Sequence, residues 1–141
     1  MKNDLSQFRA LTFDCYGTMI DWESGIWDAL QPVILANSRD DITREIALNA
    51  FARIETAQEL STPAMLYPEL LANVHKLIAA EFGMTSTDAF DDAFGASVPL
   101  WPAFPDSADA LRLLKKHFKL VILSNVPVSY THLTLPTILL V

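Results

Sequence analysis

The feature that most constrains this chain is a short apolar segment, Phe8–Phe13, that ends in Asp14 and a Tyr16-Gly17 turn. So short an apolar run, bounded by a turn, is typical of a buried β-strand rather than a helix. In open parallel α/β sheets, ligands bind outside the carboxyl ends of the strands. Asp14 is therefore a candidate nucleophile or metal ligand. The alternative is an aspartate that merely opens a turn.

A long helical stretch separates this strand from a second predicted strand, Leu120–Leu123. Apolar residues recur at helical spacing over 26–34, 46–57 and 70–82, a shorter helix is predicted over 87–94, and another runs from an N-cap at Asp106 to His117. An insertion of about 80 residues is longer than a plain crossover between parallel strands needs. We therefore expect it to form a layer of its own, a lid above the strand ends.

These elements predict an α/β fold with an incomplete doubly wound parallel sheet. We expect a Rossmann-like core formed by residues 1–18 and 99–127, and an inserted all-helical cap formed by residues 19–98. Residues 128–141 differ from the rest, because no Asp, Glu, Lys or Arg occurs after Asn125. Residues 128–137 resemble one reading frame of a sequencing adapter. We predict a non-native tail from Val128, the alternative being a genuine apolar strand.

The amino-acid composition and net charge of the chain argue against some classes of binding partner. The chain is 51% hydrophobic and 19% charged, which is typical of a globular protein. A net charge of −7 argues against nucleic acid as a partner, because phosphate backbones are bound by clustered Lys and Arg. No apolar run reaches the ~18 residues of a membrane helix, so we expect no membrane partner.

Cysteine and histidine usage gives further expectations. The single cysteine, Cys15, excludes an intrachain disulfide and a multi-cysteine metal site, which favours a cytoplasmic location. The three histidines, His75, His117 and His132, do not have metal-ligand spacing. We expect each of them to lie at the surface or to belong to the tail.

Two motifs now stand at the ends of the two predicted strands: Asp14-Cys15-Tyr16-Gly17-Thr18 and Ser124-Asn125. Together they resemble the haloacid dehalogenase superfamily. The segments Tyr16–Glu23 and Ile122–Val126 look like its type II 2-haloacid dehalogenase branch. The resemblance spans about Phe8 to Pro127, and it implies a partial hydrolase core with a helical cap.

The resemblance also implies a reaction and a set of residues. The implied enzyme is a hydrolase that cleaves carbon–halogen bonds of small-molecule 2-haloacids through an aspartyl ester on Asp14. Thr18 and Ser124 occupy the positions of hydroxyls that hold the nucleophile and the substrate carboxylate. Asn125 would position the reacting groups and, with Ser124, contact the substrate. Arg53 is the nearest match to an arginine that helps to cradle the halide.

Tyr16 bears on the choice between dehalogenase and phosphatase, and the resemblance places it among the substrate-binding residues. Phosphatases of this superfamily usually carry a second aspartate at this position as general acid. A phenol with a pKa near ~10 is a poor replacement at neutral pH, whereas a halide leaving group needs no proton. We therefore expect no metal or other cofactor. The alternatives are a metal-dependent phosphatase that uses magnesium, and an inactive fragment that acts only as an interaction module.

Two parts of the implied site have no match in this chain. The family places a lysine and then an acidic segment after the second motif, but Lys115, Lys116 and Lys119 all precede Ser124. We therefore expect the 141 residues to be a truncated, inactive N-terminal fragment of the enzyme. For the complete protein we expect a homodimer.

Overall fold

The structure is a computed structural model that describes residues 7–124. It divides into two compact units, which we call the sheet unit (Met1–Trp22 and Pro102–Val141) and the helical unit (Glu23–Trp101). The predicted tail from Val128 lies outside the described residues. None of the helices within residues 7–124 is long and apolar enough to cross a membrane.

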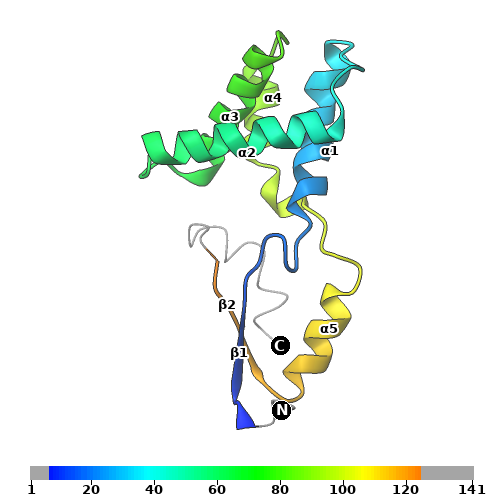
Figure 1. The fold of residues 1–141 in the computed structure, drawn as a ribbon, viewed down its shortest axis with the longest axis vertical. Helices are drawn as coiled ribbons and strands as arrows, with labels where there is room; N and C mark the ends of the chain where they lie inside the picture. Colours follow the sequence, from blue (N-terminus) through cyan, green and yellow to red (C-terminus); the bar gives the residue numbers. More distant parts are fainter. Residues whose placement is uncertain (1–6, 125–141) are drawn as a thin grey trace. The chain divides into compact units, whose positions relative to one another are not determined.

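The sheet unit contains two parallel strands that are distant in sequence. Strand β1 (Ala10–Phe13) pairs with β2 (Lys119–Ile122) in a register that runs from Ala10 opposite Lys119 to Phe13 opposite Ile122. Helix α5 (Ser107–Lys115) precedes β2 and lies beside the sheet (Figure 1). The predicted α/β class and the parallel pairing of the two strands are confirmed.

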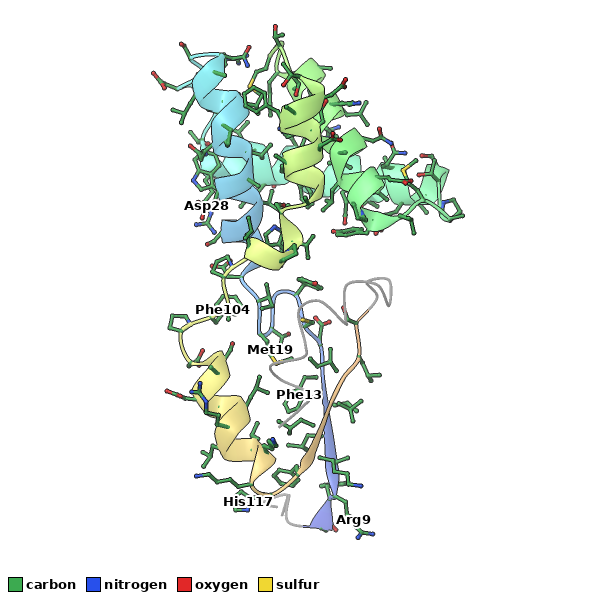
Figure 2. All side chains as sticks on the ribbon, turned by 180° about the vertical axis from the view of Figure 1, so that it is seen from behind. Arg9, Phe13, Met19, Asp28, Phe104 and His117 are labelled. Carbon is green, nitrogen blue, oxygen red and sulfur yellow. The ribbon has the colours of Figure 1, made fainter. Side chains whose placement is uncertain are left out.

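Exposure alternates along both strands, as expected for a sheet covered on one face. Phe13 and Ile122 are half-buried, whereas Thr12 and Val121 are exposed. Phe13 points from β1 toward α5 (Figure 2). One face of the sheet therefore packs against this helix.

The prediction for α5 is right in part. Asp106 is the N-cap residue of the helix, as predicted, but its side chain makes no capping hydrogen bond because its backbone is already in the helical region. Leu111 lies on the buried face of the helix, whereas Ala110 is exposed. The helix ends at Lys115, before the predicted end at His117, which is exposed as expected.

The helical unit consists of four α-helices and a short 3-10 helix. The α-helices are α1 (Trp22–Ala36), α2 (Arg44–Ser61), α3 (Tyr67–Glu81) and α4 (Asp88–Gly95), and the 3-10 helix η2 spans Val98–Leu100. The first residue of α1, Trp22, is the last residue of the first sheet-unit segment. Thr43 and Thr87 cap α2 and α4 by accepting hydrogen bonds from the backbone N–H groups of Ile46 and Phe90. Gly83, with φ of 65°, follows α3, where the left-handed conformation favours glycine.

The predicted apolar stripes were right for α1 and partly wrong for α2. In α1 the predicted residues Ile26, Leu30, Val33 and Ile34 are all buried. In α2, Ile46 is 45% exposed and the neighbouring Ala47 is buried instead. The cap at Thr43 sets where α2 begins, so Ile46 falls in the first turn and on the outer side.

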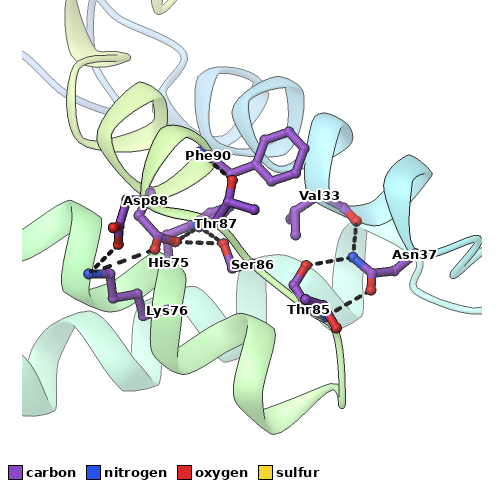
Figure 3. Close-up of polar contacts among 10 residues, drawn as sticks. Val33, Asn37, His75, Lys76, Thr85, Ser86, Thr87, Asp88 and Phe90 are labelled. Atoms are coloured by element: carbon purple, nitrogen blue, oxygen red, sulfur yellow. Dashed lines mark hydrogen bonds and ion pairs between the residues drawn. The ribbon is translucent and has the colours of Figure 1, made fainter.

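A buried polar cluster joins α3 to α4 (Figure 3). His75 was expected at the surface, but it is only 1% exposed, so that prediction is wrong. Its Nδ1 lies 2.6 Å from Oδ1 of Asp91, and the Ser86 hydroxyl donates to the same oxygen at 2.7 Å. Lys76 Nζ lies 3.8 Å from the other oxygen of Asp91. Buried His75, half-buried Ser86 and exposed Lys76 therefore converge on the one buried carboxyl group of Asp91.

This cluster makes the free energy of unfolding depend on pH. Burial lowers the pKa of His75 below its ordinary value of 6.5, although the hydrogen bond that His75 donates to Asp91 opposes the shift. As pH falls from about 7.5 to 5.5, the unfolded state takes up a proton on His75 that the folded state resists. We therefore expect the free energy of unfolding to fall over this range, and to change less in His75→Gln. Urea unfolding followed by circular dichroism measures both. A rise in stability of the original protein toward pH 5.5, lost in His75→Gln, would contradict this account.

Candidate active site

The two sequence motifs begin at the same edge of the sheet. Beyond the β1–β2 register, the backbone N–H of Leu123 donates to the carbonyl of Phe13 at 2.7 Å. Asp14 and Ser124 are the next residues on the two strands, and the strands are parallel. The structure thus brings Asp14 and Ser124 to the carboxyl ends of neighbouring strands. Asn125 lies outside the described residues.

A closed turn follows Asp14 and presents Thr18. The Cys15 carbonyl accepts hydrogen bonds from the N–H groups of Met19 at 2.8 Å and Ile20 at 3.0 Å, and Gly17 N–H donates to the Ile20 carbonyl at 2.8 Å. Gly17 has a backbone φ of 83°, a conformation that residues with a Cβ atom rarely adopt. Thr18 is exposed within this turn. The backbone of the segment is therefore held by its own hydrogen bonds.

Cys15 and Asp14 both carry side chains that can act as nucleophiles, but their surroundings differ. Cys15 is 4% exposed, and burial raises the pKa of its thiol above the ordinary value, with a smaller contribution from the charge of Asp14. The thiol therefore remains protonated at neutral pH, and a protonated thiol is a weak nucleophile. Asp14 is exposed at the sheet edge. Of these two neighbours, Asp14 therefore remains the candidate nucleophile.

Two of the predicted substrate-binding residues, Tyr16 and Arg53, lie in different units. Tyr16 is half-buried in the turn of the sheet unit, where its backbone pairs with Ile20. Arg53 lies on α2 in the helical unit, with its Nη2 2.7 Å from both carboxylate oxygens of Glu81 on α3. Its side chain is 61% exposed. Arg53 and Glu81 also line an open groove of about 330 Å³, together with Ile54, Ala57, Gln58, Ser61 and Leu77.

A second strand-like pairing supports the turn, and the sequence did not indicate it. Ile20 and Ala103 form an antiparallel bridge, Asp21 N–H donates to the Pro102 carbonyl at 2.8 Å, and Phe104 N–H donates to the Met19 carbonyl at 3.0 Å. Figure 2 labels Met19 and Phe104 on these two segments. The segment after the turn is thus bonded to the chain just before α5. Only the proline-rich composition of residues 99–105 was visible in the sequence.

Within residues 7–124, no group of three or more His, Cys, Asp or Glu side chains is placed to hold a metal ion. His75 and Asp91 are close, but they are buried together in the helical unit.

Comparison with solved structures shows the class of fold. A dehalogenase solved with an intermediate complex matches with a TM-score of 0.70 and 18% identity, over 91% of this chain and 56% of that one. An L-2-haloacid dehalogenase from Xanthobacter autotrophicus matches with a TM-score of 0.68 and 18% identity, over 90% and 50%. The putative HAD-hydrolase YfnB from Bacillus subtilis, solved bound to magnesium, matches with a TM-score of 0.66 and 16% identity, over 92% and 59%.

These likenesses confirm, at the level of the fold, the resemblance that the two motifs predicted. The described helices and the parallel strand pair match a HAD-like Rossmann core with a helical cap. The chain spans between 50% and 59% of the length of the three solved chains. Its sequence matches none of the family models and none of the curated proteins with which it was compared.

Proposed function

We propose that the complete protein containing this chain is a hydrolase that cleaves the carbon–halogen bond of 2-haloacids through an ester on Asp14. One observation carries the proposal: Asp14 and Ser124 leave paired parallel strands at one edge, in a fold shared with dehalogenases. Tyr16, in place of an acid, favours a leaving group that needs no proton.

In the first step, a carboxylate oxygen of Asp14 attacks the halogen-bearing carbon beside the substrate carboxylate. The new C–O bond forms as the C–halogen bond breaks, and the bonding electron pair leaves with the halide. Ser124 and Thr18 are the hydroxyls proposed to hold the substrate carboxylate and the nucleophile, with Asn125 positioning the reacting groups. Since halide is a very weak base, this step needs no general acid.

In the second step, an activated water hydrolyses the ester. Its oxygen adds to the ester carbonyl and the ester bond breaks, which restores the carboxylate of Asp14 and releases a 2-hydroxyacid. One proton of the water goes to the product hydroxyl and the other is released. We assign water activation to the acidic segment that the family resemblance places after the second motif. Within the helical unit, the buried carboxyl of Asp91 is already hydrogen-bonded to His75 and Ser86.

A metal-dependent phosphatase is the second candidate, favoured by the likeness to a hydrolase solved with magnesium. Asp14 would then attack phosphorus, and the alkoxide leaving group would require a proton. Tyr16 is a poor donor for that proton at neutral pH, since a phenol ordinarily has a pKa near ~10. The dehalogenase is therefore the preferred proposal, and the two differ in their need for metal.

The nucleophile is tested with the complete protein and short 2-haloacids. We expect Asp14→Asn to lower halide release by at least about a thousandfold, because an amide does not form the ester. Asp106→Asn is the matched control: it makes the same chemical change at an exposed aspartate of the same unit that makes no capping bond. A chelator should leave the rate unchanged. Metal-dependent turnover of a phosphate ester in preference to 2-haloacids would instead establish the phosphatase.

Arg53 can be tested separately, because its ion pair offers a control. If Arg53 contributes to the halide cradle, Arg53→Ala should lower kcat for halide release by about tenfold. Glu81→Ala breaks the same ion pair but keeps the guanidinium, so it should retain nearly full activity. Equal losses in the two variants would assign Arg53 to a structural role only.

A further inference from the structure

The carbonyl of Met19 is one of the points at which the Asp14 turn is bonded to the chain entering α5. It accepts two hydrogen bonds, from the Phe104 N–H at 3.0 Å and from the Ser107 hydroxyl at 2.9 Å. Ser107 is the first residue of α5 and lies 88 positions beyond Met19 in the sequence. Both residues are buried, so water competes little for this carbonyl.

The same peptide group is held at its other end by the turn itself. The peptide bond after Met19 carries the carbonyl that receives Ser107 and also the N–H of Ile20, which donates to the Cys15 carbonyl at 3.0 Å. Because a peptide group is planar, fixing its oxygen also fixes the direction of its N–H. Ser107 therefore orients a hydrogen bond to the residue that directly follows Asp14.

The Ser107 hydroxyl is itself held in place. The Ser107 N–H donates to the Phe104 carbonyl at 3.0 Å, while Phe104 N–H donates to Met19. Ser107 and Phe104 thus form a small loop of hydrogen bonds around one acceptor. Asp106, not Ser107, occupies the N-cap position of α5. The Ser107 hydroxyl is therefore not a helix cap, and it donates to a carbonyl that is distant in the sequence.

We infer that Ser107 is a positioning residue that holds the Asp14–Thr18 segment in its reactive conformation through the carbonyl of Met19. This role rests on the function proposed above. Displacement at carbon requires the attacking oxygen opposite the leaving halide, so a small shift of Asp14 slows the reaction. Without the hydroxyl, Met19 keeps only the bond from Phe104, and the peptide plane gains freedom to rotate.

The experiment compares Ser107→Ala with Ser107→Thr, which keeps the hydroxyl, in the complete protein. Thr56→Ala is the matched control, because the Thr56 hydroxyl donates to the Ala52 carbonyl on the surface of α2. Single-turnover halide release separates two quantities: the amplitude counts competent molecules, and the rate reports the placement of Asp14. Hydrogen exchange of the peptide spanning residues 15–21 measures the turn without reference to activity.

We expect Ser107→Ala to lower the single-turnover rate on the order of tenfold with unchanged amplitude and KM, and to accelerate exchange in residues 15–21. Ser107→Thr should restore both, and Thr56→Ala should change neither. Reduced amplitude at an unchanged rate would overturn the inference, because that is the signature of a purely structural role. Should Ser107→Ala fail to fold, Ser107→Cys, a weaker donor of similar size, is measured in the same way.

The failure of this inference differs from the failure of the proposed function. Halide release that is lost in Asp14→Asn but complete in Ser107→Ala would overturn the role of Ser107 alone. Halide release that persists in Asp14→Asn would overturn both, because no reaction at Asp14 would remain to be positioned.

Discussion

The parallel pairing of β1 with β2 is the constraint on which the rest of the structure depends. Parallel strands cannot be joined by a tight turn, so a long connection must lie between them. In this chain the connection includes the whole helical unit and α5. The pairing places Asp14 and Ser124, 110 positions apart by their residue numbers, at one sheet edge. A candidate site formed from such distant residues exists only when this pairing is made.

Within each unit, hydrogen bonds to a few buried acceptor groups hold neighbouring segments of the chain together. In the sheet unit, the Cys15 and Met19 carbonyls together hold the turn that follows Asp14. In the helical unit, the Asp91 carboxyl accepts from His75 and Ser86 and thereby joins α3 to α4. Buried acceptors must be satisfied, so each of these bonds is costly to lose.

The sequence predicted the elements more reliably than their contacts. The α1 stripe was predictable because Ile26, Leu30 and Val33 repeat at helical spacing. His75 was misplaced because a histidine was taken as polar, although it shares the buried face of α3 with Leu71 and Ile78. The bond from Ser107 to Met19 could not be predicted, because no local pattern relates residues 88 positions apart. The partner of Arg53, Glu81, was unpredictable for the same reason.

The central claim is that Asp14 forms a covalent ester whose hydrolysis regenerates its carboxylate. Turnover of a 2-haloacid by the complete protein in heavy-oxygen water tests this claim most directly, followed by mass spectrometry of the peptide that contains Asp14. The account predicts that heavy oxygen enters the Asp14 carboxylate over repeated turnovers, because water attacks the ester carbonyl. Heavy oxygen found only in the hydroxyacid product, with the Asp14 peptide unlabelled after many turnovers, would contradict it.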